Sequence, residues 1–140
     1  MSVQRERGFT LVELMVVVAI VSILASIALP AYSYYVMKSR IPDATSNLAS
    51  KRVQQEQFFQ DNRTYVNGTG CAADSVASQF FDFSCNNVSA TTYTLQAVGK
   101  GPMAGFTYTV DETNAKASSL PSDWGGATTG CWVSKKGGGC

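Results

Sequence analysis

The residues best suited to covalent or metal chemistry in this chain are its four cysteines, Cys71, Cys85, Cys131 and Cys140. The chain has no histidine, so it lacks the commonest general base and the commonest zinc ligand. A structural zinc site usually needs cysteines in close pairs such as Cys-x-x-Cys, and that spacing does not occur here. These residue types therefore predict disulfides, and they predict no enzymatic activity, no metal and no cofactor.

All four cysteines lie in the second half of the chain, where they allow three disulfide pairings. We favour Cys71–Cys85 with Cys131–Cys140 over the crossed alternatives, because this pairing closes two short local loops. Disulfides persist in an oxidising compartment, so the cysteine-bearing half is expected to function outside the cytoplasm.

One carboxylate, Glu13, lies at the front edge of a long apolar segment. No charged residue occurs from Leu14 to Met37, which exceeds the roughly 20 residues that cross a bilayer as a helix. The basic residues before this segment favour a cytoplasmic N-terminus. A helix dipole stabilises a carboxylate in the first turn by about 0.3–1 kcal/mol. Placing an acid deep in a bilayer costs roughly 2.5 kcal/mol or more, so Glu13 is expected to need a partner.

The helix-compatible pattern continues beyond the apolar segment, and we predict one long helix over about residues 9–61. Its second half carries a modest apolar stripe made of Ala44, Leu48, Ala49 and Val53. Two prolines, Pro30 and Pro42, each remove a backbone donor and are expected to bend or locally loosen this helix.

Strand signals follow a segment with loop composition. Residues 66–89 are rich in Gly, Ser, Thr, Asn and Cys, which predicts a loop closed by Cys71 and Cys85. Beyond it, short strands are predicted at residues 92–98, 105–111, 115–118 and 130–134. Together these elements predict an α+β fold in which a four-stranded antiparallel sheet packs on the long helix.

The N-terminal stretch GFTLVELMVVVAIVSILASIALPAY, residues 8–32, resembles the type IV prepilin signal. It has the glycine, the aromatic residue, the glutamate (Glu13) and the proline where that family has them. In that family a membrane peptidase cuts after the glycine, here Gly8, and methylates the new N-terminal residue, here Phe9. A secretory signal peptide cut after Ala28 fits less well, because its apolar core would contain no acid and would end there.

The whole chain is similar in layout to type IV pilins, most of all to minor pilins of the PilE type from type IVa systems. The resemblance implies a leader over residues 1–8, a membrane-spanning and filament-core half-helix over 9–37, and a globular domain over 38–140. It also implies a precursor in the bacterial inner membrane and then a place in an extracellular pilus. The expected partners are other pilin subunits, the prepilin peptidase and methyltransferase, and the membrane itself.

The same resemblance gives Glu13 and Pro30 roles in a filament. Cutting after Gly8 frees an α-amino group on Phe9, which is largely cationic at neutral pH. We expect this cation to pair with Glu13 of a neighbouring subunit and so to select the stagger between helices. Pro30 ends a stretch that in the family can lose helical structure in assembled filaments, and a plain kink is the alternative.

Two other classes of function share parts of this pattern. A type II secretion pseudopilin has the same N-terminus, but the acidic calcium-binding loop typical of major pseudopilins is missing here. A pilus-tip module that binds DNA or a host surface is the other alternative. The terminal CWVSKKGGGC resembles the disulfide-bounded D-region of pilins, yet Lys135 and Lys136 alone are weak evidence for nucleic acid. We therefore expect a solvated, stapled loop on a structural subunit used for motility, adhesion or DNA uptake.

Overall fold

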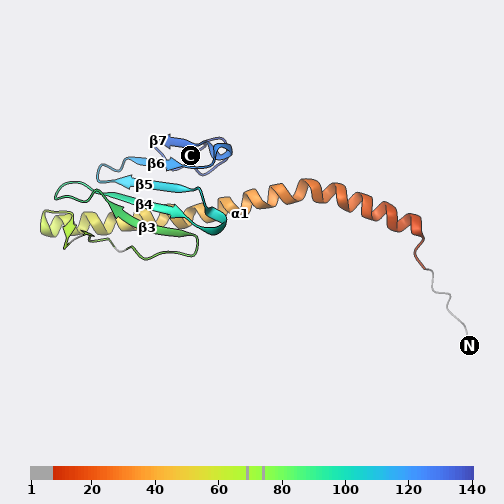
Figure 1. The fold of residues 1–140 in the computed structure, drawn as a ribbon, viewed down its shortest axis with the longest axis horizontal. Helices are drawn as coiled ribbons and strands as arrows, with labels where there is room; N and C mark the ends of the chain where they lie inside the picture. Colours follow the sequence, from red (N-terminus) through yellow and green to blue (C-terminus); the bar gives the residue numbers. More distant parts are fainter. Residues whose placement is uncertain (1–7, 69, 74) are drawn as a thin grey trace, which may run out of the picture. The chain divides into compact units, whose positions relative to one another are not determined.

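The computed structural model describes residues 8–68, 70–73 and 75–140. The chain divides into two compact units, one ending at Val36 and the other formed by Met37–Cys140. A single helix, α1 (Leu11–Asn62), belongs to both units, and the strands all belong to the second (Figure 1). The predicted helix over about residues 9–61 is therefore confirmed.

Both prolines of α1 lie within a continuous helix. The backbone is helical at every residue of α1, so neither Pro30 nor Pro42 ends it. A serine hydroxyl follows each proline and contacts its carbonyl: Ser33 Oγ donates to Pro30 at 2.9 Å, and Ser46 Oγ donates to Pro42. The backbone is helical on both sides of Pro30 in this single chain. A kink at Pro30, or a loss of helical structure there inside a filament, stays a prediction.

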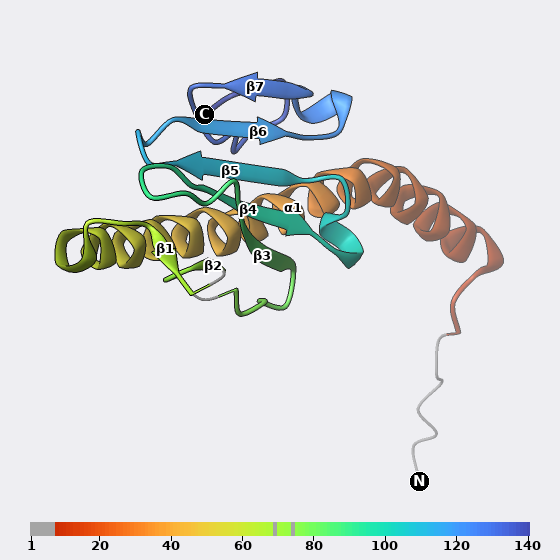
Figure 2. The same cartoon turned by 60° about the vertical axis from the view of Figure 1, so that its left-hand side comes forward.

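Five antiparallel strands form the main sheet, and each pairs with the next along the chain (Figure 2). Their bounds are β3 (Phe81–Asn86), β4 (Thr94–Gly99), β5 (Thr107–Asp111), β6 (Lys116–Ser119) and β7 (Ala127–Thr129). A separate antiparallel hairpin pairs β1 (Val66–Asn67) with β2 (Gly70–Cys71). Two 3-10 helices, η1 (Gly101–Met103) and η2 (Ser122–Trp124), lie in the β4–β5 and β6–β7 connections.

The predicted antiparallel sheet is confirmed, but its strand count and its two ends are wrong. β3 lies inside the segment 66–89 that its composition assigned to a loop. Polar residues there hide an alternation in which Phe81 and Phe83 are buried and Asp82 is exposed. The last strand is β7 and not residues 130–134, because that segment is held by side-chain hydroxyls instead of a strand ladder.

The core lies between the second half of α1 and the inner face of the sheet. Its larger apolar members are Ile41, Leu48, Phe81, Phe83, Tyr93, Leu95, Phe106, Tyr108, Val110 and Trp124. The expected apolar stripe is half right, because Ala44 and Leu48 are buried whereas Ala49 is exposed and Val53 is 53% exposed. Each methylene group that leaves water in this core contributes about 0.8 kcal/mol.

Two polar residues of α1, Lys51 and Gln55, are buried, although the expected apolar stripe did not include them. Gln55 is fully buried and links α1 to the segment that follows it. Its side-chain nitrogen donates to the Tyr65 carbonyl at 2.6 Å, and its oxygen accepts the Ala73 N–H at 3.0 Å. Both polar ends are therefore satisfied, which makes the burial of this amide tolerable.

The β4–β5 connection requires glycine at Gly99. A Cβ there would lie 1.9 Å from the Met103 carbonyl oxygen and 3.0 Å from that of Phe106. We predict that Gly99→Ala lowers the free energy of unfolding of the globular unit by about 1–3 kcal/mol, because the turn backbone must move. Gly70→Ala is the matched control, since nothing lies within 4 Å of its added Cβ. Equal loss of stability in the two variants, measured by chemical denaturation, would contradict this account.

Candidate functional site

The candidate assembly site begins with Gly8, Phe9 and Thr10, which precede α1 and are exposed. Phe9 is 86% exposed. Thr10 and Glu13 bind each other reciprocally: the Glu13 carboxylate accepts the Thr10 N–H at 2.9 Å and the Thr10 hydroxyl at 2.8 Å. The Thr10 hydroxyl in turn accepts the Glu13 N–H at 3.2 Å. This is a capping box, which satisfies two of the otherwise open donors at a helix N-terminus.

The capping box changes the interpretation of Glu13. From the sequence its carboxylate was expected to lack a partner within the subunit. In the structure it accepts two hydrogen bonds from Thr10 of the same chain. Thr10 was missed, although the spacing Thr-x-x-Glu before an apolar run is a visible signal of such a box. Thr10 is neutral, so the negative charge of Glu13 stays uncompensated by it.

The first part of α1 exposes apolar side chains all round. Its long apolar stretch is the one segment of the described residues with the length and composition of a membrane span, and none of that stretch is buried. The two serines inside it do not offer free hydroxyls, since Ser22 donates to the Val18 carbonyl and Ser26 to the Ile23 carbonyl, each at 2.7 Å. Both serine hydroxyls of this stretch are thus satisfied within the helix, as a lipid or a protein interior requires.

The exposed face of the second half of α1 carries no charge. Between residues 42 and 60, the exposed side chains are Pro42, Ser46, Ala49, Ser50, Val53, Gln54, Gln57 and Gln60. The ionisable residues of the same stretch are Asp43, Lys51, Arg52 and Glu56, which are buried or half-buried. We call the first set the uncharged face of α1. Another helix could cover this face without burying an unpaired charge.

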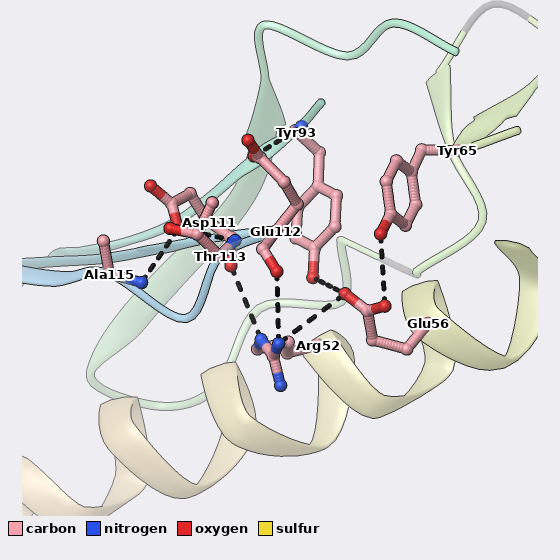
Figure 3. A network of polar contacts seen from close by, with 8 residues as sticks. All are labelled: Arg52, Glu56, Tyr65, Tyr93, Asp111, Glu112, Thr113 and Ala115. Atoms are coloured by element: carbon pink, nitrogen blue, oxygen red, sulfur yellow. Dashed lines mark hydrogen bonds and ion pairs between the residues drawn. The ribbon is translucent and has the colours of Figure 1, made fainter. Parts of the chain in front are cut away.

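A cluster of polar contacts joins α1 to the β5–β6 turn (Figure 3). Arg52 donates from Nη2 to the Glu112 carbonyl at 3.2 Å and from Nε to the Asp111 carbonyl at 3.4 Å. The Asp111 carboxylate holds the turn itself, because its Oδ1 accepts the N–H groups of Thr113 at 2.9 Å and Ala115 at 2.8 Å. The β5–β6 turn is therefore held by its own aspartate, and α1 caps its open carbonyls.

Glu56 completes this cluster on the other side of Arg52, from which it lies 3.8 Å away. Its two oxygens accept hydrogen bonds from the Tyr93 hydroxyl at 2.7 Å and the Tyr65 hydroxyl at 3.1 Å. Burial, together with Glu56, raises the pKa of both tyrosines above the ordinary phenol value. Both phenols therefore stay protonated donors at any physiological pH, and the cluster fixes the helix against the sheet.

Two disulfides are present, Cys71–Cys85 and Cys131–Cys140, with Cα–Cα distances of 6.2 Å and 6.1 Å. This is the local pairing expected from the sequence. The first joins β2 to β3, so Cys85 lies on a strand and not in the loop expected there. The second closes the C-terminal loop, residues 131–140. Among the described residues, no group of three His, Cys, Asp or Glu side chains is placed to hold a metal.

Two buried hydroxyls anchor the start of the C-terminal loop to the sheet. Ser118 on β6 donates to the Cys131 carbonyl at 3.1 Å and accepts the Val133 N–H at 3.0 Å. Tyr108 on β5 donates to the Val133 carbonyl at 3.1 Å. These contacts span 13 to 25 residues of sequence, so no local pattern announces them.

The glycine-rich end of the C-terminal loop docks on η2. The N–H groups of Gly137 and Gly138 donate to the carbonyls of Asp123 and Trp124 at 3.2 Å and 3.1 Å. Gly125 permits this approach, because a Cβ there would lie 2.5 Å from the Gly138 Cα. The stapled loop is therefore a folded part of the domain.

Residues 116–140 contain three lysines, Lys116, Lys135 and Lys136. Lys136 Nζ lies 2.8 Å from the Asp123 carboxylate, and this hydrogen bond lowers the pKa of Asp123. Lys116 Nζ lies 4.6 Å from the centre of the Trp132 ring, whose Nε1 donates to the Thr109 carbonyl. Lys135 is exposed and forms no ion pair with a described residue.

Comparisons with known proteins agree with these features. Residues 30–118 match the family "Type IV minor pilin ComP, DNA uptake sequence receptor", and residues 3–29 match the prokaryotic N-terminal methylation motif. The fimbrial protein EcpC of Eikenella corrodens is 31% identical over 90% of this chain and 95% of its own length. A fimbrial protein of Moraxella nonliquefaciens is 39% identical over 51% of this chain and 46% of its own length.

Solved structures give the same fold. The minor pilin PilV of Neisseria meningitidis superposes with a TM-score of 0.55 at 16% identity, over 62% of this chain and 90% of that one. The long helix packed on an antiparallel sheet, together with the methylation motif at residues 3–29, defines a type IV pilin. Since one family model covers more than half of the chain, the chain belongs to the type IV minor pilin ComP family.

Ser118 provides a direct test of how the C-terminal loop is held. Ser118→Ala leaves the buried Val133 N–H without its acceptor, which should cost about 1–3 kcal/mol of unfolding free energy. Hydrogen exchange within residues 131–140 should also accelerate. The neighbouring Ser119 is exposed, so Ser119→Ala should change stability by no more than about 0.5 kcal/mol. A stable Ser118→Ala protein with an unchanged loop would contradict this role of the Ser118 hydroxyl.

Proposed function

We propose that this minor pilin enters the filament through α1 after cleavage between Gly8 and Phe9, and that its globular domain binds DNA. Assembly is supported by the two properties of α1 described above, an apolar first part and the uncharged face of its second half. Helices of this kind associate in lipid by close packing, because lipid is as apolar as their side chains. Small residues such as Ala19, Ala25 and Ala28 allow that approach.

The charge on Glu13 is proposed to set the register of this packing. Thr10 holds the carboxylate but leaves its charge, so a cation in apolar surroundings would still lower its energy. The α-amino group of Phe9, freed by cleavage and methylated, is such a cation when it belongs to a neighbouring subunit. Only one stagger between two helices brings the amine of one to the acid of the other.

The observation that carries the DNA proposal is the match of residues 30–118 to a family described as a DNA uptake sequence receptor. The lysine pair alone did not favour nucleic acid. Residues 116–140 contain three lysines and a single carboxylate, Asp123, so this part of the sequence is basic although the whole chain has a net charge of +1. Lysines contact DNA phosphates and release counterions, which makes binding depend on salt.

Processing is the first step that can be tested. Gly8→Val should leave an uncut precursor in the membrane, because a branched side chain crowds the peptide bond to be cleaved. The native chain should start at N-methyl-Phe9 when its intact mass is measured. A native chain that starts at Met1, or after Ala28, would contradict the proposed processing.

Glu13→Val and Glu13→Gln together separate the charge of this residue from its capping role. Glutamine still accepts the two Thr10 hydrogen bonds but carries no charge, whereas valine does neither. If register depends on the charge pair, both variants should be cut and stay in the membrane, yet be depleted from sheared filaments when expressed beside the native subunit. If capping alone matters, Glu13→Gln should enter filaments as well as the native chain does. Its normal incorporation would therefore contradict the intersubunit pair.

DNA binding is tested with the globular unit, Met37–Cys140, in a gel-shift titration at several salt concentrations. Lys135→Gln should weaken binding and reduce the salt slope by about 1, as the loss of one phosphate contact requires. Asp123→Asn should strengthen binding, because it removes a negative charge and frees Lys136. Lys100→Gln is the charge-matched control, since Lys100 is paired with Asp82 on β3. Equal effects of Lys135→Gln and Lys100→Gln would contradict a DNA surface at the C-terminal loop.

A further inference from the structure

We infer that Asn67 is a site of spontaneous deamidation, at which the subunit changes its charge and backbone with age. Asn67 ends β1, and it is the one asparagine in the chain that is followed by glycine. Asn67 also begins one of three Asn-x-Ser/Thr triplets, which we interpret as chance matches. The inference concerns the β1–β2 hairpin and does not depend on DNA binding.

The reaction needs only the chain and water. The backbone nitrogen of Gly68 attacks the side-chain Cγ of Asn67, a C–N bond forms, and the side-chain nitrogen leaves as ammonia with the proton of the attacking amide. The resulting five-membered succinimide is then opened by one water molecule. Opening at one carbonyl gives aspartate, and opening at the other gives isoaspartate, in which the main chain passes through the side-chain carbon. Either product is a carboxylic acid, so the net charge falls by one at neutral pH.

The hairpin leaves both reacting groups accessible. Asn67 is exposed, and no hydrogen bond of its side chain to a described residue is present. Gly68 follows with φ of +63°, and no atom lies within 4 Å of the position where a Cβ would be. The pairing of Asn67 with Gly70 leaves Gly68 outside the β1–β2 ladder. A glycine nitrogen is also the least hindered nucleophile that a main chain offers.

The fold hinders the same reaction at two other asparagines, Asn62 and Asn114. Each lies at or next to a residue with positive φ, as Asn67 does. At Asn114 the attacking nitrogen would be that of Ala115, and it already donates to Asp111 Oδ1 at 2.8 Å. At Asn62 the side chain donates to the Phe58 carbonyl, and the next nitrogen, that of Arg63, donates to Phe59 at 2.8 Å. Attack at these two sites requires hydrogen bonds to break first. At Asn67, neither the side chain nor the Gly68 nitrogen has a hydrogen bond to a residue that the structure describes.

The segments on both sides of Asn67 are anchored, so the backbone change at Asn67 stays within the β1–β2 hairpin. Gln55 holds the carbonyl of Tyr65 on one side, and the disulfide from Cys71 to Cys85 holds the other. Isoaspartate adds one main-chain atom between these anchors and shifts the pairing of β1 with β2. The product is therefore a local mark on an otherwise unchanged domain.

The test uses the full chain, purified in detergent micelles and incubated at mildly alkaline pH. Peptide mapping by mass spectrometry, with fragmentation that distinguishes isoaspartate from aspartate, follows Asn62, Asn67 and Asn114 in one sample. Asn67 should convert at least about tenfold faster than the other two, because glycine does not hinder the attack. A denatured and reduced sample supplies the comparison without the fold. There Asn62 and Asn114 should convert faster than in the folded chain, and Asn67 at a similar rate.

Two variants make the outcome decisive. Asn67→Gln should abolish conversion of this peptide, because the corresponding six-membered ring forms far more slowly, and its backbone remains that of the native hairpin. Gly68→Ala should slow conversion about tenfold, because a Cβ crowds the nucleophile and alanine is strained at the φ of +63° that Gly68 adopts. Conversion of Asn67 at the same rate as Asn62 and Asn114 would overturn the inference. So would protection of Asn67 in the folded chain relative to the denatured one.

Discussion

The structure depends first on the contact between the second half of α1 and the sheet. That half-helix turns every ionisable side chain between residues 42 and 60 toward the sheet or its loops, and leaves uncharged residues outside. Arg52 donates to a backbone carbonyl of the β5–β6 turn, and Glu56 accepts a hydrogen bond from a tyrosine hydroxyl (Figure 3). Both charged groups therefore have polar partners at the edge of the core. The result is the uncharged face of α1. A filament subunit needs such a face on the side that meets other helices, because no unpaired charge is then buried.

The rest of the globular domain is small and relies on anchors besides its core. Each disulfide closes a loop of about 10–15 residues, worth roughly 2–3 kcal/mol in the chain-entropy model. The hydroxyls of Ser118 and Tyr108 and the docking of the loop glycines on η2 then place the C-terminal loop. A surface that recognises a ligand benefits from such order, because less conformational entropy is lost on binding.

The sequence predicted α1, the antiparallel sheet and the local pairing of cysteines because each depends on neighbours in the chain. β3 was missed since Asp82, Ser84 and Asn86 gave it loop composition, although its buried Phe81 and Phe83 alternate as a strand requires. Gln55 was missed as a core residue because nothing local shows that two backbone groups will satisfy its amide. The anchors of the C-terminal loop depend on contacts between distant segments. The capping box of Thr10 and Glu13 could have been predicted from its spacing.

The central claim is that this chain is a processed subunit of a surface filament, and mass spectrometry of sheared filaments tests it most directly. One measurement reports the N-terminus, the location and the abundance of the chain. The account predicts a chain that begins at N-methyl-Phe9, keeps both disulfides and is present in filaments at a small fraction of the major subunit. A chain that begins at Met1, or one that is found in membranes but not in sheared filaments, would contradict the account.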